Sequence, residues 1–360
     1  MEKALYDPEE GYYSTRIDNI GLNQSADFFT SPSLSPIFGM TIARFIMHMY
    51  DMLEDSSLVF LEVGAGDGTT AGQIIGYLKK HRPAMLKRFS YLALEHYGAR
   101  LSRLRGNISH LSNVMVVSDI EAIEPITGII FSNEFFDALP VHRVVQVGKA
   151  LKEIYLCTEG STFHETVLEL SDEGLKEFLV KEEIELHDGQ IADISLEWGR
   201  WVKKLAGKLK KGCMITIDYG YPAYELYSPI RKNGSLRAYR HHQISNNYYD
   251  EPAEQDLTSH VDFTALAKAG EEAGLVTIGL SDQLRMFLAL GVHEILEELE
   301  KESENFTQYQ LAVQPAKALF MPGGIGEIFK VLAQSRNLDF SVVNKLRSLI
   351  PPKYKLYNTT

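Results

Sequence analysis

The sequence contains very little cysteine. Cys157 and Cys213 are the only two among 360 residues, too few for a disulfide framework or a cysteine-based zinc site. Long apolar runs are missing as well: none approaches the ~18 residues of a membrane span. The acidic start, residues 1–13, has neither the apolar centre of a signal peptide nor the Arg and Ser bias of a transit peptide. These absences predict no membrane span and a location in the reducing cytoplasm.

The sequence has fewer basic residues than acidic ones. Lys and Arg number 36 against 48 Asp and Glu, a formal net charge of −12, which argues against broad binding of nucleic acid or anionic membranes and suits a basic partner. Side chains that could bind a metal occur at His241, His242, Asp256, His260 and Asp262. Their spacing matches no known metal motif closely, and Asp262 is predicted to cap a helix. We therefore expect no metal and no nucleic-acid partner.

One stretch, residues 58–70 (LVFLEVGAGDGTT), organises the rest of the chain. Its continuous apolar run is typical of a strand buried on both faces, and the glycines after it permit a tight turn with close backbone approach to a ligand. The glycine spacing differs from the dinucleotide pattern, and no Lys-Ser/Thr follows as in a phosphate-binding loop. A nucleoside ligand without phosphates fits better, with S-adenosylmethionine as the candidate. A purely structural turn is the alternative.

Polar residues follow four successive predicted strands. The strands are expected at Leu58–Val63, Tyr91–Leu94, Val114–Val117 and Gly128–Phe131, and the polar residues near their ends are Glu62, Glu95, Asp119, Asn133 and Glu134. Ligands of open parallel sheets bind outside the carboxyl ends of the strands. Glu95 also stands where nucleotide-binding folds place the acceptor for the ribose hydroxyls.

The pattern predicts one α/β domain with two insertions. We expect an irregular lead segment at 1–35, core at 36–138, inserted antiparallel strands and a helix at 139–195, core at 196–220, a loop-rich insertion at 221–260, core at 261–336 and a tail at 337–360. A helix is predicted near Ile191–Leu209. In the lead segment, the aromatic stretch Asp27–Pro32 either folds over a ligand or fastens the segment to the core.

Several motifs together resemble a known family. They are ALYDPEEGYY, DFFTSPSLSPIFG, LEVGAGDGT, SNEFFDALPVHR, IDYGYP, GSLRAYRHH, DLTSHVDFTAL and GEIFKVL. The chain is similar to the MidA-like class I S-adenosylmethionine-dependent methyltransferases, a family that includes a mitochondrial complex I assembly factor with protein arginine methyltransferase activity. The segments IGLNQSADF and YDEPAEQDLT match the family more loosely.

The resemblance implies a seven-stranded class I methyltransferase sheet of the Rossmann-like type, and it implies the roles of particular residues. The cofactor contacts would be Glu62, Gly64, Gly66 and Gly68 at the first turn, Glu95 on the ribose, Asp119 on the adenine amino group, Ile120 on the adenine ring, and Asn133 near the methyl group. Glu134 would border the methyl group and the incoming nucleophile.

Methyl transfer from a sulfonium needs alignment first and a proton acceptor second. Positioning can supply roughly 7–11 kcal/mol of such a barrier, whereas a general base adds about 10²–10⁴-fold. A guanidinium stays protonated in proteins, so a carboxylate pair that holds its donors and accepts the proton late suits it. Glu134 and Asp137 are close enough in sequence to form that pair, with Asn133 positioning the substrate. The alternatives are a loop carboxylate at Glu134 and a simple turn at Asp137.

The leading hypothesis is a cytoplasmic S-adenosylmethionine-dependent methyltransferase that acts on a protein arginine nitrogen. Two rivals stay open: a small-molecule O- or N-methyltransferase, and a non-catalytic assembly factor that binds the cofactor. The identity of the acceptor and the oligomeric state are not encoded in any of these patterns.

Overall fold

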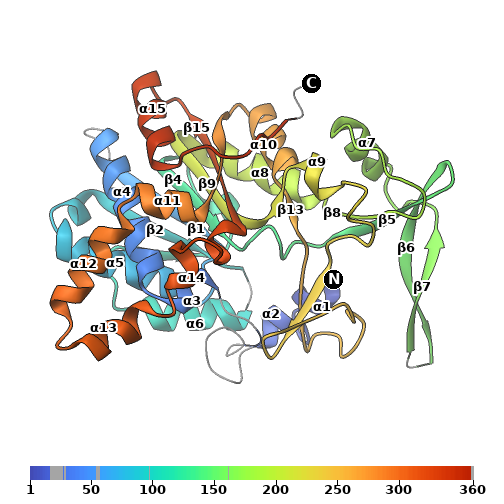
Figure 1. The fold of residues 1–360 in the computed structure, drawn as a ribbon, viewed down its shortest axis with the longest axis horizontal. Coiled ribbons are helices and arrows are strands. Elements are labelled where there is room, and N and C mark those ends of the chain that lie inside the picture. The colour runs from blue at the N-terminus through green and yellow to red at the C-terminus, as the bar shows by residue number, and fades with distance from the viewer. Residues whose placement is uncertain (17–26, 28–29, 54–56, 97, 161, 358–360) are drawn as a thin grey trace.

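The structure is a computed structural model that describes residues 1–16, 27, 30–53, 57–96, 98–160 and 162–357. Its centre is a mostly parallel sheet of seven strands in the order β14-β15-β9-β4-β1-β2-β3 (Figure 1). Only β15 runs antiparallel to its neighbours β9 and β14 on this path. The strands are β1 Leu58–Val63, β2 Phe89–Leu94, β3 Val114–Val117, β4 Ile126–Asn133, β9 Leu209–Tyr221, β14 Val276–Asp282 and β15 Phe329–Arg336, and β13 (Val261–Asp262) pairs with the end of β9. The predicted α/β class and seven-stranded sheet are confirmed.

Helices cover both faces of this sheet. Side chains of β1 alternate between the two sides: Phe60 packs in the core formed with α4 and α5, and Leu61 and Val63 pack in the core formed with α8 and α10. These helices are α4 Ile37–Met52, α5 Thr69–His81, α8 Glu197–Lys208 and α10 Phe263–Glu272. The other helices of the core are α6 Gly98–Ile108, α11 Gln283–Ala289, α12 Val292–Glu302, α13 Phe306–Val313, α14 Lys317–Phe320 and α15 Phe340–Leu349, with 3-10 turns η1 Met85–Arg88, η2 Ile120–Ala122 and η3 Ile325–Glu327.

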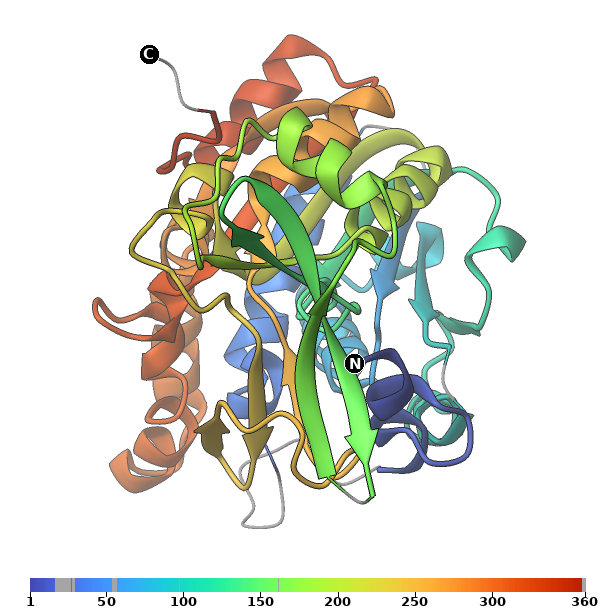
Figure 2. The ribbon, with the colours of Figure 1, turned by 90° about the vertical axis from the view of Figure 1, so that its right-hand side faces the viewer.

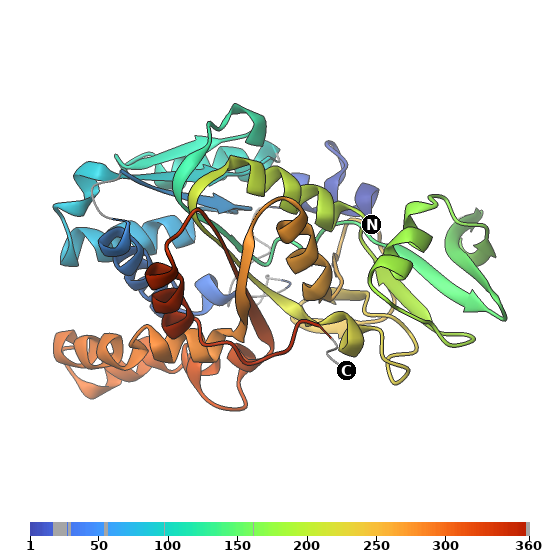
Figure 3. The same cartoon turned by 90° about the horizontal axis from the view of Figure 1, so that it is seen from above.

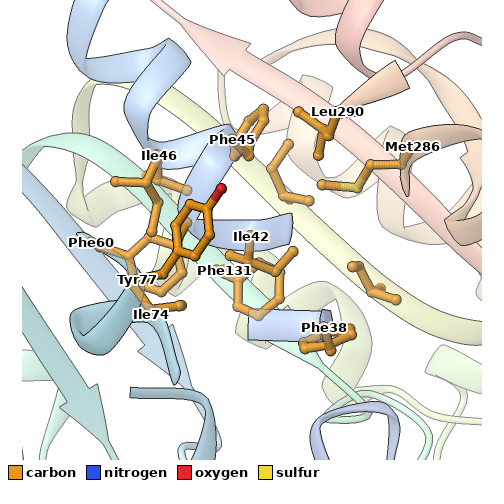
Figure 4. Close-up of a cluster of buried hydrophobic side chains, with 14 of the residues drawn as sticks. Phe38, Ile42, Phe45, Ile46, Phe60, Ile74, Tyr77, Phe131, Met286 and Leu290 are labelled. Carbon is orange, nitrogen blue, oxygen red and sulfur yellow. The ribbon is translucent and has the colours of Figure 1, made fainter. Parts of the chain in front are cut away.

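Helix α4 illustrates how the sequence pattern becomes packing. Phe38, Ile42, Phe45 and Met49 recur at spacings of three and four, which places them on one helix face, and all four are buried. Figure 4 shows this face against Phe60 and Phe131 of the sheet, Ile74 and Tyr77 of α5, and Met286 and Leu290. The helix that this spacing predicts is therefore present, and its apolar face packs in the core on one side of the sheet.

The first insertion forms a small separate sheet. Its four antiparallel strands lie in the order β7-β6-β5-β8 and are β5 His142–Val147, β6 Ala150–Glu159, β7 Thr162–Leu168 and β8 Ile191–Ile194. Helix α7 (Gly174–Lys181) lies between β7 and β8 in the chain. In Figures 1 and 3 this green unit lies on the side of the molecule opposite α12 and α13. The helix predicted over Ile191–Leu209 is thus partly wrong: Ile191–Ile194 pairs with β5, and the helix begins only at Glu197, because strand pairing overrides a helix-like apolar spacing.

Three segments expected to be irregular contain regular structure. The lead segment holds α1 Glu2–Tyr6, α2 Tyr12–Thr15 and α3 Ser31–Leu34; residues 221–260 hold α9 Ala223–Leu226 and the three-stranded sheet β11-β10-β12; the expected tail holds α15. The strands of that sheet are β10 Arg237–Arg240, β11 Gln243–Ser245 and β12 Asp256–Thr258. Leu5 and Tyr12 form an apolar cluster with Ala238 and Leu257, so the lead segment is fastened to the second insertion (Figures 1 and 2). Among the described residues, no helix has both the length and the apolar character that crossing a bilayer requires.

A close approach of three strands leads to a stability prediction. Gly128 of β4 pairs with Val59 and Gly212 at φ +152°, and a Cβ there would lie 1.9 Å from the Val59 carbonyl oxygen. We expect Gly128→Ala to lower the free energy of unfolding by about 2–4 kcal/mol, since the sheet must shift or strain. Gly76→Ala on the exposed side of α5, where a Cβ meets nothing within 4 Å, is the control and should raise it by ~0.5–1 kcal/mol. Urea unfolding of both variants measures the difference, and equal stabilities would contradict the steric argument.

Candidate functional site

A cavity of about 510 Å³ opens at the carboxyl ends of the central strands. The turn after β1 and the residues after β2 and β4 supply one part of its lining; the lead segment, including α3, and the second insertion supply the other. The register aligns Val63 with Leu94 of β2 and Ser132 of β4, so the residues that follow these strands meet at one edge. The cavity therefore opens at the edge of the sheet where the sequence predicts a ligand site, and its second wall comes from distant segments.

The three glycines of the turn have different surroundings. Gly66 has φ +58°, and a Cβ on it would meet nothing within 4 Å, so its backbone faces open space in the cavity. A Cβ on Gly64 would meet Phe135 at 3.1 Å, and one on Gly68 would lie 2.5 Å from Ile108 of α6. Gly64 and Gly66 line the cavity, whereas Gly68 begins α5 in a left-handed conformation and packs against protein.

Glu62 is held at the end of β1 by a neighbouring strand. The Tyr91 hydroxyl of β2 donates to Glu62 Oε2 at 2.6 Å. Burial raises the pKa of Glu62 to about 8, although the hydrogen bond from Tyr91 opposes the shift. Desolvation favours the protonated, neutral form of a buried carboxyl, and a cation that binds beside the carboxyl favours its ionised form.

Glu95 connects the end of β2 to the glycine turn. Its Oε2 accepts from the Gly66 N–H at 3.0 Å, and its Oε1 accepts from the His96 N–H at 3.0 Å. The carboxylate lines the cavity beside Gly66. This position suits an acceptor for a pair of ligand hydroxyls, as expected from its distance after the glycines.

Glu134 occupies a strained position directly after β4. Its φ is +51°, unusual for a residue with a side chain and frequent at functional sites. Oε1 accepts from Asn133 Nδ2 at 2.9 Å and from the Ser31 N–H at 3.3 Å. Burial, with the charge of Asp137 adding to it, raises the pKa of Glu134 to about 8. Asn133 Oδ1 is buried without a hydrogen-bond partner among the described residues, so it is available to a donor in the cavity.

Asp137 lies beside Glu134 in the cavity, and Asp218 holds the loop that contains it. The backbone N–H groups of Phe136 and Asp137 donate to Asp218 Oδ2 at 3.0 and 3.3 Å, which fixes the loop after β4. Burial raises the pKa of Asp137 to about 7, and its Oδ1 has no hydrogen-bond partner within the part of the chain that is described. Asp218, which belongs to the motif IDYGYP, therefore acts through this loop.

The second wall contains functional candidates that the sequence patterns missed. Tyr6 donates to the Ala138 carbonyl oxygen at 2.7 Å, Tyr13 donates to Asp256 Oδ1 at 2.7 Å, and Tyr12 donates to Asp27 Oδ2 at 2.8 Å. Tyr6, Tyr13, Asp27 and Asp256 line the cavity. The motif ALYDPEEGYY contains the signal for these tyrosines, and the motif DLTSHVDFTAL begins at Asp256, for which the sequence suggests only a possible metal ligand.

Some predicted residues lie away from the cavity. Asp119 accepts from the Glu121 N–H at 2.9 Å and so caps η2, and Ile120 is buried in the core against α8 and α10. Neither lines the cavity. Phe28 and Phe29 of the predicted aromatic stretch lie outside the described residues, whereas Thr30, Ser31 and Pro32 line the cavity.

The potential metal ligands serve other purposes in the described chain. Asp262 accepts from the Thr264 and Ala265 N–H groups at 2.9 and 3.0 Å as the cap of α10. Among the described residues, no group of three or more His, Cys, Asp or Glu side chains is arranged to hold a metal ion.

The charge of the cavity indicates the kind of ligand it binds. Seven of its described lining residues are acidic, against one arginine, Arg100, and no lysine. The acids are Asp27, Glu62, Asp67, Glu95, Glu134, Asp137 and Asp256. Buried carboxylates without countercharges are unfavourable, so the arrangement favours cationic ligands.

Comparisons with known proteins agree with this chemistry. A sequence model of a family of S-adenosyl-L-methionine-dependent methyltransferases matches residues 41–281. The mitochondrial protein arginine methyltransferase NDUFAF7 of Danio rerio is 24% identical, with 96% of this chain and 83% of the relative covered. The Homo sapiens protein of the same name is 23% identical, with 92% and 78% covered. These relatives are named as mitochondrial proteins; the predicted cytoplasmic location is therefore wrong, and the names point to the mitochondrion.

Solved structures with the same fold extend the comparison. A protein from Burkholderia thailandensis, solved with bound S-adenosyl-homocysteine, has a TM-score of 0.82 and 27% identity, covering 94% of this chain and 87% of the other. A second structure from that organism has a TM-score of 0.80 and 26% identity, covering 94% and 86%. Since the family match spans more than half of the sequence, the chain belongs to the S-adenosyl-L-methionine-dependent methyltransferases, in the MidA-like family that its motifs resemble.

Proposed function

We propose that this methyltransferase transfers the methyl group of S-adenosylmethionine to an arginine side chain of a protein substrate in the mitochondrion. The observation that carries the proposal is the pair Glu134, half-buried, and Asp137, buried, whose carboxyls line one cavity rich in acids. The names of the NDUFAF7 relatives support both the acceptor and the location.

The residues present fit the cofactor. Gly66 leaves open space where any side chain would project, Glu95 offers carboxylate oxygens beside it, and Asn133 Oδ1 is a buried acceptor with no partner in the described part of the chain. Glu62, Gly64, Gly66, Glu95 and Asn133 would hold the cofactor, while Gly68 would act through helix packing. The contacts of Asp119 and Ile120 with the adenine of the cofactor stay predictions from the family resemblance.

The cofactor, when bound, supplies an electrophilic methyl group on a positively charged sulfur. The protein orients the acceptor nitrogen and receives its proton. Glu134 Oε1 is occupied by Asn133 and Ser31, which leaves Oε2 as the atom that accepts the proton. Asp137 would hold a second guanidinium N–H, since a planar guanidinium donates in parallel pairs to carboxylates.

One assay separates the proposal from its rivals. The protein is incubated with methyl-labelled S-adenosylmethionine and mitochondrial extract, followed by mass spectrometry of methylarginine sites. Label on an arginine of a protein supports the proposal. Label recovered in small molecules indicates a small-molecule methyltransferase, and binding without transfer indicates a non-catalytic factor.

The glycine turn supplies a matched pair of variants for the cofactor site. Gly66 (φ +58°) and Gly148 (φ +57°) have nearly the same φ, and a Cβ on either would meet nothing within 4 Å, but of the two only Gly66 lines the cavity. We expect Gly66→Val and Gly148→Val to cost similar stability, about 1–3 kcal/mol. Only Gly66→Val should weaken S-adenosyl-homocysteine binding, by at least about tenfold, or ~1.4 kcal/mol. Calorimetric titration measures this; equal affinities in the two variants would place the cofactor elsewhere.

The proton acceptor is tested by Glu134→Gln. The amide preserves size but accepts no proton, so kcat should fall by about 10²–10⁴-fold, with cofactor affinity nearly unchanged.

Because the carboxyl has a raised pKa of about 8, kcat/KM of the unaltered enzyme should rise from pH 6 towards pH 9 as Glu134 ionises. Glu134→Gln should lose this part of the profile. The control is Glu177→Gln on the exposed face of α7, which should leave kcat unchanged. An unchanged kcat in Glu134→Gln would show that Glu134 takes no part in the mechanism.

A further inference from the structure

We propose that Asp256, held by Tyr13, is a third carboxylate of the acceptor pocket and selects a guanidinium over a primary ammonium. The inference rests on the proposed function and adds a residue that determines its specificity. It assigns the acceptor side of the cavity to the second insertion and the lead segment, the two segments whose roles the sequence patterns leave open.

The placement of Asp256 supports this role. It belongs to β12, pairs with Tyr239 of β10, is 2% exposed and lines the cavity. The segment that follows it is joined to the loop after β4, since the Ser259 N–H donates to the Asp137 carbonyl oxygen at 3.0 Å. Burial is the main cause of the raised pKa of Glu134 and Asp137, and the charge of Asp256 adds to it. The second wall thus brings an acid into the cavity that contains the pair we assign to the acceptor.

A second feature of this wall is aromatic. Tyr6, Tyr13, Tyr219 and Tyr239 line the cavity together with Asp256. A guanidinium of the chain itself lies against one of these rings: the central carbon of Arg100 lies 4.3 Å from the centre of the Tyr13 ring. Guanidinium groups stack on aromatic rings and donate in their own plane, whereas an ammonium is a compact charge that needs no planar arrangement. Carboxylates and aromatic rings that line one cavity therefore favour arginine.

Tyr13 keeps Asp256 ready to bind a cation. Its hydroxyl donates to Asp256 Oδ1 at 2.7 Å. Burial raises the pKa of Asp256 to about 6, while the hydrogen bond from Tyr13 and the charge of Arg100 lower it. Titratable groups that face Asp256 from the neighbouring elements are Tyr13, Asp27, Arg100, Glu134, Asp137 and Tyr239. Loss of the Tyr13 hydroxyl would therefore raise the pKa of Asp256 further and leave less carboxylate at neutral pH.

The experiment measures binding separately from catalysis. With the full chain saturated by S-adenosyl-homocysteine, N-acetyl-L-arginine amide and N-acetyl-L-lysine amide are titrated by calorimetry. We expect the arginine derivative to bind at least about tenfold more tightly in the unaltered protein. Asp256→Asn should reduce this ratio by about tenfold and leave S-adenosyl-homocysteine affinity within about twofold. Asp250→Asn, an exposed acid of the same insertion, is the matched control and should change neither.

The Tyr13→Phe variant tests whether Tyr13 acts on the pKa of Asp256 or only holds α2 in place. If Tyr13 acts through Asp256, the variant loses arginine affinity at pH 6–7 and regains it towards pH 9, where Asp256 is ionised. An equal loss at every pH, or an arginine-to-lysine ratio unchanged in Asp256→Asn, would overturn the inference while leaving the proposed function intact. Equal binding of both derivatives by the unaltered protein would overturn the arginine acceptor itself, and with it this inference.

Discussion

Desolvation of carboxyl groups at one edge of the sheet is the constraint on which the rest of the structure depends. Parallel strands bring Glu62, Glu95 and Glu134 together because their carboxyl ends meet there. Burying acids without countercharges is unfavourable, and the fold limits this cost with hydroxyl and backbone donors, such as Tyr91 on Glu62 and Gly66 on Glu95. The site is thus arranged for a cation before any ligand arrives, as electrostatic preorganisation requires.

The core and one half of the site were predictable because their signals are local. The continuous apolar run before the glycines specifies a buried strand, and the acids follow strand ends at readable positions. The apolar spacing of α4 likewise predicts the face that Phe38 and Phe45 bury. In each case a few neighbouring residues contain the whole signal, and tertiary packing agrees with it.

The other half depends on contacts that no local pattern encodes. Tyr13 and Asp256 are 243 positions apart, and Tyr6 and Ala138 are 132 apart. Local chemistry also misled at one strand: Ile191–Ile194 joins a sheet although its spacing suits a helix. Gly68 is required by the side chains of α6, which sequence alone does not place.

The raised pKa values of Glu62, Glu134 and Asp137 make cation binding a proton-releasing event. Near neutral pH these carboxyls hold part of their protons in the empty cavity, and a positive ligand drives those protons into solution. The surrounding buffer takes them up with its own heat of ionisation. The enthalpy of binding will consequently differ between phosphate and Tris even where the affinity is the same, and the slope of that difference counts the protons displaced.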